Sequence, residues 1–328
     1  MDSTVKITVL MCTYNRCRLL GETIESVATQ ALPQSVSWEI LVVDNHSSDE
    51  TRQVVESLQR RYPDRIRYFF EPQQGISYAR NAGIREARGE ILAFIDDDET
   101  ADPGWLQNLT ANLHSGEWSG AGGRVLPPST FIPPRWLLGK NKFASGPLAS
   151  FDLGPEARQM EEPPFGANMA FRRFVFAELG GFRTDLGRVG NNLISNEDTE
   201  LGRRMMAAGM RIRYEPSAIT HHPVEEARVR KEYFLAWWFN KGRSDIREFG
   251  NQPGVTRFLG IPLRLFRAFA WEATQWMISI EPSKRFGRKT ETWACAGQIF
   301  ESYRQRHDRK RMGTERNADD EPTVEGGE

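Results

Sequence analysis

Four consecutive acidic residues, Asp96 to Glu99, are the part of the sequence best suited to chemistry. They directly follow the apolar run Ile91–Ile95, which is typical of a buried strand. Carboxylates this close together raise one another's pKa, and a divalent cation such as Mg²⁺ or Mn²⁺ removes that cost. An open parallel sheet binds its ligand beyond the carboxyl ends of its strands. The acids therefore predict a metal site for a phosphorylated substrate, with an acidic turn in solvent as the alternative.

Alternating strand and helix patterns place two further polar clusters at the same edge. Apolar runs predict strands over 5–11, 38–43, 66–70 and 91–95, with helical patterns over 18–30, from 48 onward and over 77–87. This order predicts parallel strands with right-handed crossovers. Cys12–Arg16 and Asp44–Asp49 follow the first and second strands, so we expect both segments beside the acids.

The sequence after residue 100 predicts a second half of the sheet. Residues 127–164 are rich in Pro, Gly and Ser and predict a long surface loop with little regular structure. A strand-to-helix unit over 166–173 and a helix from Asn196 to Gly209 follow. A strand over 210–214 and a separate extended piece over 218–222 complete this part.

We therefore expect three regions along the chain. An α/β domain covers 1–225, divided into a nucleotide-binding half, 1–100, and a second half, 101–225. A helical region rich in Trp, Phe and Arg covers 226–312, and a polar, acidic tail over 313–328 is expected to be disordered.

Composition limits the class of protein. The chain has 328 residues, enough for one large domain with an appendage. Its net charge of -1 gives no overall attraction to nucleic acid, so no such partner is expected. Three cysteines, Cys12, Cys17 and Cys295, are an odd count that fits a reduced cytosolic protein, and Cys12 and Cys17 lack zinc-ligand spacing. No apolar run approaches the ~20 residues that span a bilayer, so we expect a soluble or peripheral cytoplasmic chain.

Short motifs in a fixed order carry a resemblance to a known family. In chain order they are Thr13–Arg16, Val42–Asp49, Gly75–Asn81, Ala87–Glu90, Asp96–Asp98, Gly166–Met169, Gly180–Phe182, Asn196–Asp198 and Pro216–His222. Together they resemble the family 2 glycosyltransferases of the GT-A fold, over roughly residues 5–245. The resemblance implies an α/β nucleotide-diphospho-sugar transferase fold, with a mostly parallel Rossmann-like sheet flanked by helices. It also implies that 1–225 is the GT-A catalytic domain and that 101–225 is its acceptor-side half, followed in this chain by a C-terminal helical extension.

The resemblance also implies a role for each matching residue. Asp98 matches the acid that binds a metal, Mn²⁺ or Mg²⁺, bridging the diphosphate. His222 matches a histidine that approaches this metal, and its register makes it preferable to His221. Asp198 matches the catalytic base. Donor-nucleotide contacts are implied for Thr13, Asn15, Asp44, Arg80 and Asp96. Supporting positions are Asp97, Glu197 and Asn168.

Several of these residues have structural alternatives. Asp198 could cap the helix that follows it. Asp44 begins an Asp-Asn-x-Ser-Ser sequence that is typical of a turn, and Thr13 could simply end a strand. Histidines on an extended segment, such as His222, are often structural or exposed.

The implied activity is metal-dependent, inverting transfer of one sugar from a nucleoside-diphosphate donor, with a UDP-sugar favoured. The acceptor is a hydroxyl on a lipid-linked or growing polysaccharide. The Gln-x-x-Arg-Trp stretch of processive members is absent from the sequence, so one sugar per visit is expected. Two alternatives remain. Asp96 and Asp98 also fit the Asp-x-Asp-x-Thr motif of haloacid-dehalogenase-type phosphatases, and a catalytically silent sugar-nucleotide binding module would share the fold.

The C-terminal region suggests a further partner. Between Arg257 and Arg311 basic residues outnumber acids, and Trp271 and Trp276 lie among them. Trp favours the membrane interface, and basic residues favour anionic lipid. We therefore expect peripheral contact with the inner face of the membrane, with solvated arginines on packed helices as the alternative.

Overall fold

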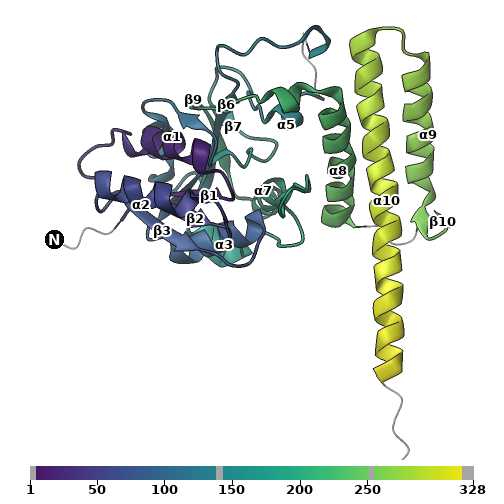
Figure 1. Cartoon of the computed structure of the whole chain (residues 1–328), viewed down its shortest axis with the longest axis horizontal. Helices are drawn as coiled ribbons and strands as arrows, with labels where there is room; N and C mark the ends of the chain where they lie inside the picture. Colours follow the sequence, from purple (N-terminus) through teal and green to yellow (C-terminus); the bar gives the residue numbers. More distant parts are fainter. Residues whose placement is uncertain (1–4, 138–142, 251–254, 320–328) are drawn as a thin grey trace, which may run out of the picture. The chain divides into compact units, whose positions relative to one another are not determined.

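The computed structural model describes residues 5–137, 143–250 and 255–319, with side chains described through Asp308. The chain forms two compact units, 1–234 and 235–328. The first unit ends slightly later than the predicted domain boundary at 225. Figure 1 shows the elements of both units, and each unit is treated separately below.

The first hundred residues alternate between strand and helix, as predicted. The elements are β1 Ile7–Thr13, α1 Cys17–Ala28, β2 Trp38–Asp44, α2 Thr51–Arg61, β3 Ile66–Phe70, α3 Ile76–Glu86 and β4 Ile91–Asp96. Strand side chains alternate between the two faces of the sheet. Ile7, Val9 and Met11 of β1 therefore pack in one buried cluster with side chains of α1 and α2. Leu10 packs in a second cluster with side chains of α3.

The rest of the first unit extends the sheet. The elements are β5 Thr100–Ala101, α4 Trp105–Thr110, η1 Ala111–Leu113, β6 Gly120–Leu126, η2 Arg135–Leu137, α5 Ser145–Leu148, β7 Arg158–Gln159, β8 Asn168–Arg172, α6 Phe174–Leu179, α7 Glu197–Ala207, β9 Ile212–His221 and η3 Glu226–Val229. The described parts of the predicted loop, 127–137 and 143–164, hold only the short elements η2, α5 and β7.

One strand differs from the sequence prediction. The two extended pieces expected at 210–214 and 218–222 belong to a single strand, β9, despite Pro216 within it. Its pairing with β6 shifts register between Gly122 and Arg124. Proline is tolerated at such an irregularity because no regular ladder bond is required there.

Six strands of the main sheet run in one direction. The order is β3-β2-β1-β4-β8-β6-β9-β5, with β7 also pairing with β9. Strands β1 to β4 are mutually parallel. β8 is antiparallel to both β4 and β6, so β6 and its parallel partner β9 run in the direction of β4. The predicted α/β fold with a mostly parallel sheet is confirmed. The carboxyl ends of these six strands meet one edge.

The second unit is helical. It contains most of α8 (Lys231–Phe249), a small hairpin of β10 Arg257–Phe258 and β11 Ile261–Pro262, then α9 Leu263–Ile278 and α10 Pro282–Asp319. Helices α9 and α10 lie side by side as a hairpin (Figure 1). α10 continues to Asp319, past Gly313, where we predicted the disordered tail to begin; residues 320–328 lie outside the described residues. Among the described helices, none is both long and apolar enough to span a membrane.

Candidate active site

The sheet topology brings the predicted site residues to one edge. Across adjacent parallel strands, Thr13 pairs with Asp44, and Cys12 pairs with Asp96. β8 runs the other way, so its first residues lie at this edge too, with Asn168 opposite Ile95. The end of β9 joins the same edge because it runs parallel to β6. Segments spread over two hundred residues of sequence therefore surround one site.

Asp98 lies at the centre of a buried charged cluster. Its Oδ2 accepts a hydrogen bond from Arg16 Nη1 at 2.7 Å and lies 4.0 Å from Arg228 Nη2. Its Oδ1 lies 3.4 Å from His222 Nε2. Burial by itself raises the pKa of Asp98, but His222, Arg16 and Arg228 outweigh burial and hold the pKa below its usual value. Asp98 is therefore an ionised carboxylate with two arginine side chains beside it.

The structure separates the two neighbouring histidines. His222 is buried beside Asp98, and burial lowers the pKa of its imidazole. Its Nδ1 is buried with no hydrogen-bond partner among the described residues. His221 faces elsewhere, with its Nε2 3.0 Å from Asp102 Oδ1. The geometry therefore places His222, and not His221, in the cluster.

Two side chains here have the right chemistry for a divalent cation. Mg²⁺ and Mn²⁺ are commonly held by one or two protein ligands, completed by substrate phosphates and water. Within the described part of the chain, no three His, Cys, Asp or Glu side chains converge as a full ligand set. The buried carboxylate of Asp98 and the neutral imidazole of His222, with its unpaired Nδ1, fit a partial set of this kind.

Two residues predicted to bind the nucleotide, Asn15 and Asp44, form hydrogen bonds in the loops after β1 and β2. The Ser47 Oγ accepts the Asn15 N–H at 2.9 Å, and Asn15 Oδ1 accepts the Ser48 N–H at 2.8 Å. Asp44 is buried and accepts the Ser47 N–H and the Tyr68 hydroxyl, both at 2.8 Å. These bonds match the turn role considered for Asp44, and they also fix its carboxylate at the edge of the sheet.

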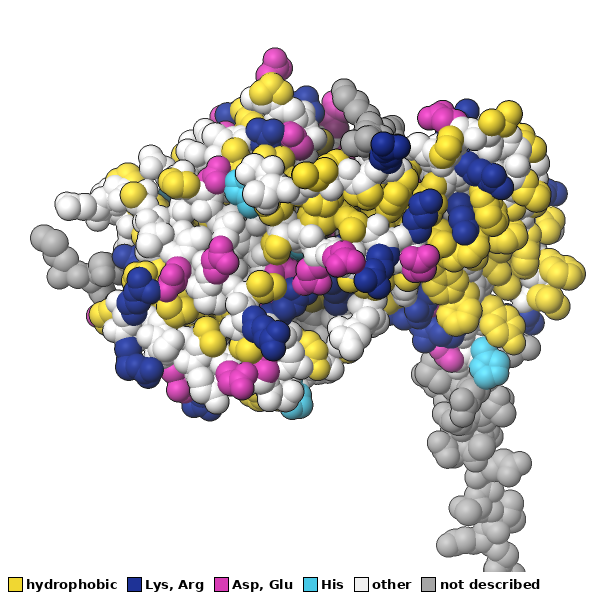
Figure 2. Space-filling view, turned by 45° about the horizontal axis from the view of Figure 1, so that its top comes forward, with side chains coloured by type: hydrophobic (Ala, Val, Ile, Leu, Met, Phe, Trp, Pro, Cys, Tyr) yellow, Lys and Arg dark blue, Asp and Glu magenta, His cyan; other side chains and the backbone are white. Residues whose placement is uncertain are grey.

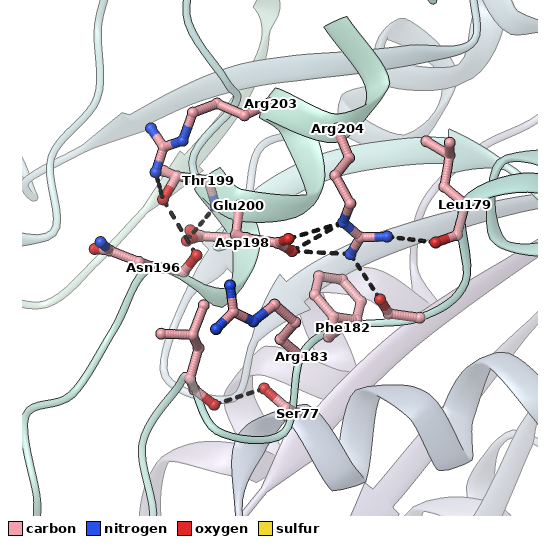
Figure 3. Close-up of polar contacts among 12 residues, drawn as sticks. Ser77, Leu179, Phe182, Arg183, Asn196, Asp198, Thr199, Glu200, Arg203 and Arg204 are labelled. Atoms are coloured by element: carbon pink, nitrogen blue, oxygen red, sulfur yellow. Dashed lines mark hydrogen bonds and ion pairs between the residues drawn. The ribbon is translucent and has the colours of Figure 1, made fainter. Parts of the chain in front are cut away.

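Asp198 lies in the first turn of α7, next to the loop that precedes β8. Its Oδ2 accepts the Gly166 N–H at 2.7 Å, and its Oδ1 accepts the Thr199 N–H at 2.7 Å. The N-cap residue is Asn196, so Asp198 is not the cap itself. Figure 3 shows Arg204, in the last turn of α7, bonded to Glu200 in the first turn and to the Leu179 carbonyl.

Arg80 joins the two sides of the site. This side chain is buried, and its Nη1 donates to Glu197 Oε1 at 2.8 Å. Its Nη2 lies 3.4 Å from the Gly166 carbonyl and 3.7 Å from Asp96 Oδ1. Burial and the neighbouring Asp198 raise the pKa of Glu197 to about 7, against the opposing effect of Arg80. Arg80 thus connects the acid motif to the start of α7.

Two predicted supporting residues have different surroundings. Asp97 lies within the acid cluster, where burial and Asp98 raise its pKa to about 7. Asn168 is fully buried and uses its amide for structural bonds. It donates to the carbonyls of Arg124 and Ala218 and accepts from Trp105 Nε1, each at 2.9 Å. The structure therefore joins β8 to β6, β9 and α4 through Asn168, without bringing its amide into the charged cluster.

Sequence analysis did not single out some residues of this site. Arg16 and Arg228 both approach Asp98, and Gly166 holds Asp198 through its backbone. Two residues that the sequence did single out, Thr13 and Glu99, have side-chain oxygens (Thr13 Oγ1 and both carboxyl oxygens of Glu99) that are buried without hydrogen-bond partners among the described residues. Arg16 and Gly166 lie inside recognised motifs, so position alone was a signal for them. Arg228 ends the segment 223–228, whose register favoured His222 over His221.

Comparison with known proteins agrees with this arrangement. The sequence model of Glycosyl transferase family 2 matches residues 8–180. The succinoglycan biosynthesis protein ExoM of Rhizobium meliloti is 30% identical over 250 residues, which cover 75% of this chain and 76% of that protein. The glucosyl-dolichyl phosphate glucuronosyltransferase of Haloferax volcanii is 28% identical over 249 residues, covering 71% of this chain and 75% of that protein.

A solved structure shares the fold. The mannosyltransferase PcManGT of Pyrobaculum calidifontis, in complex with GDP-Man and Mn²⁺, aligns with a TM-score of 0.60 and 20% identity over 92% of this chain and 88% of that chain. The phosphatase alternative is not favoured. The acid motif follows β4, the fourth strand along the chain, and the family model that matches the chain describes glycosyltransferases. The family match, the long alignment with ExoM and the shared architecture show that this chain belongs to glycosyl transferase family 2 and is a glycosyltransferase with the GT-A fold.

Proposed function

We propose that this enzyme is a metal-dependent, inverting glycosyltransferase that moves one sugar from a nucleoside-diphosphate donor to a hydroxyl acceptor. The observation that carries the proposal is the pairing of two separate clusters at one sheet edge. Asp98 and His222 form the first, with Arg16 and Arg228 around them. Asp198, held by a backbone N–H, forms the second.

The first cluster suits a diphosphate leaving group. Asp98 and His222 would hold Mn²⁺ or Mg²⁺, which when bound supplies positive charge to the leaving phosphate. Arg16 and Arg228 bring two further positive charges to the same place. Groups already fixed where negative charge develops stabilise a transition state without reorganising. The protein therefore favours departure of the nucleoside diphosphate.

The second cluster suits proton removal from the acceptor. Asp198 accepts the proton of the attacking hydroxyl as the hydroxyl oxygen bonds to the anomeric carbon. The Gly166 N–H fixes the carboxylate, and Glu197 with Arg80 supports the start of α7. One base and one displacement place the new bond opposite the leaving group, so the anomeric configuration inverts.

The donor nucleotide is assigned to Thr13, Asn15, Asp44, Arg80 and Asp96. The fixed carboxylate of Asp44 can accept a hydrogen bond from a base N–H, which agrees with the uracil favoured by the sequence resemblance. PcManGT holds GDP-Man, and guanine, like uracil, has a ring N–H that can donate to the Asp44 carboxylate. GDP-sugars therefore belong in the test.

The proposed acceptor is a lipid-linked or growing polysaccharide. The name of the Haloferax relative gives glucosyl-dolichyl phosphate as its substrate, and the Rhizobium relative is named for succinoglycan biosynthesis. An acceptor carried on lipid would place the enzyme at the cytoplasmic face of the membrane, where we propose peripheral contact.

A donor panel tests the proposal. UDP- and GDP-sugars are incubated with the enzyme, with Mn²⁺, Mg²⁺ or chelator, and nucleoside diphosphate release is measured. Metal-dependent release from one donor, with the product anomer identified by NMR, is the expected result. Release that survives chelation, or retention of configuration, contradicts the proposal. Phosphate release from simple esters without any sugar nucleotide would instead support the phosphatase alternative.

A further inference from the structure

The turn between α9 and α10 exposes an apolar tip. Met277 and Ile278 end α9, and Ile280 follows in the connection. These side chains are 67%, 63% and 95% exposed, and Trp271, two turns earlier, is 61% exposed. Figure 2 shows hydrophobic side chains gathered over these helices, with Lys and Arg side chains among them. Large apolar side chains grouped in this way mark an interaction site.

The exposed residues form one side of α9. Residues three and four apart lie on the same side of a helix. Arg264, Arg267, Trp271 and Ile278 follow this spacing, and all four are exposed. The opposite side carries Leu265, which is buried in the unit's own core. The outer side is therefore basic where α9 begins and apolar where it ends.

Basic residues also follow the turn. Lys284 and Arg285 are exposed in the first turn of α10. The Lys289 ammonium lies 5.2 Å from the ring centroids of both Trp276 and Trp293, just behind the tip. These are three basic residues close to the turn, against one exposed acid there, Glu281. The charge around the tip is thus positive, although the whole chain is nearly neutral.

We propose that this tip, consisting of Trp271, Met277, Ile278, Ile280, Lys284 and Arg285, inserts into the interface of an anionic membrane. Trp271 and Ile278 are seven positions apart, which is about 10 Å along a helix. Interfacial helices bury their apolar side chains by roughly 5–10 Å, and their basic residues contact anionic headgroups. A second copy of the chain would bring the same positive charges against this tip, so charge favours lipid over self-association.

The proposal deepens the proposed function, on which it rests, by naming the surface that would reach a lipid-linked acceptor. Its test uses the full chain and vesicles of equal parts phosphatidylglycerol and phosphatidylcholine, compared with phosphatidylcholine alone. We expect co-sedimentation with the anionic vesicles, weakened by salt because surface charges are screened. The double variants Ile278→Ser/Ile280→Ser and Lys284→Gln/Arg285→Gln should each lower the partition coefficient by roughly tenfold or more.

Matched controls keep the test sharp. Ile132→Ser removes an apolar side chain that is 86% exposed in the first unit, and Arg60→Gln removes an exposed charge there. Both controls should bind vesicles like the unaltered chain. Equal binding by the tip variants, or equal binding to neutral vesicles, overturns the proposal. So does a concentration-dependent dimer that the tip variants dissociate, since the apolar tip would then be covered by a second copy.

Failure of this proposal is distinguishable from failure of the proposed function. Calorimetry of the same variants with UDP or GDP and Mn²⁺ reports the donor site, which lies in the first unit. We expect unchanged nucleotide affinity in every tip variant.

Discussion

At the scale of single residues, Asp98 is a buried carboxylate with charged partners on several sides. Its carboxylate is buried beside His222, yet the guanidinium groups of Arg16 and Arg228 favour its ionised form. Two fixed positive charges at this place suit a diphosphate, because the bound ligand brings several negative charges.

Asp98→Asn tests this environment. Removing the charged ligand while keeping the shape should weaken Mn²⁺-dependent binding of the donor diphosphate by at least about tenfold and abolish most transfer. Calorimetry with nucleoside diphosphate, with and without Mn²⁺, measures the effect. Asp102→Asn is the matched control, because Asp102 pairs with the neighbouring His221 instead. Unchanged metal-dependent binding in Asp98→Asn would exclude this residue as the ligand.

Asp198 and Gly166 make a second prediction. Asp198→Asn should lower turnover by roughly 10²–10⁴-fold while donor affinity persists. Gly166→Ala should have a similar effect, since its new Cβ would lie 2.6 Å from Asp198 Oδ2 and displace the carboxylate. Gly21→Ala is the control, with a Cβ at an ordinary 3.7 Å from Val54. Near-normal turnover in Asp198→Asn, together with a lower melting temperature, would favour a purely structural role.

Glu197 should make stability depend on pH. Its pKa is raised by burial to about 7, so between about pH 4.5 and 7 the folded chain holds a proton that the unfolded chain releases. The free energy of unfolding should therefore fall as pH rises through this window, by at most about 1.4 kcal/mol per pH unit. Glu197→Gln should flatten that slope of melting temperature against pH, whereas Glu162→Gln, an exposed control, should not. Identical slopes in all three proteins would contradict the assignment.

At the scale of elements, the helical unit depends on a buried ion cluster. Glu301 on α10 is fully buried and accepts hydrogen bonds from Arg243 and Arg247 on α8, at 3.0 and 2.9 Å. Arg304, one turn along α10, bonds to the same carboxylate. These contacts lower the pKa of Glu301 in spite of its burial. The carboxylate therefore joins α8 to α10.

Glu301→Gln should loosen this junction. The substitution leaves three arginines without their carboxylate partner. Because these arginines are partly exposed, water screens their positive charges, and we expect the free energy of unfolding to fall by about 1–3 kcal/mol. Chemical denaturation monitored by circular dichroism measures it. Glu281→Gln, an exposed position on the same hairpin, should change stability by only a few tenths of a kcal/mol. A loss no larger than the control's would mean that the cluster is energetically neutral.

At the scale of the whole molecule, the residues assigned to donor and base all lie in the first compact unit, and the exposed apolar tip lies in the second. A ligand stabilises the part of a protein that binds it by mass action. Nucleoside diphosphate with Mn²⁺ should therefore slow amide hydrogen exchange at the ends of β1, β2 and β4, and leave exchange in α9 unchanged. Hydrogen-exchange mass spectrometry gives this map. Protection confined to the helical unit would contradict the assignment of the nucleotide site to the first unit.

The sequence alone determined the order and nature of most elements. Apolar runs and helical periodicity are local signals, so β3 was predicted with its observed bounds and the other early elements to within a few residues. The sequence also identified the acid motif, Asp198 and His222, because the family's short motifs follow one another in a fixed order along the chain. Their functional roles stay predictions.

Tertiary structure alone decided which side chains meet. The continuity of β9 across Pro216 depended on an irregularity in its partner β6, which no local pattern encodes. Arg228 approaches Asp98 across more than a hundred residues of sequence, and Arg80 pairs with Glu197 over a similar separation. Such contacts arise because parallel strands end at a common edge. Burial then selects the partners, since a charge removed from water requires another charge beside it.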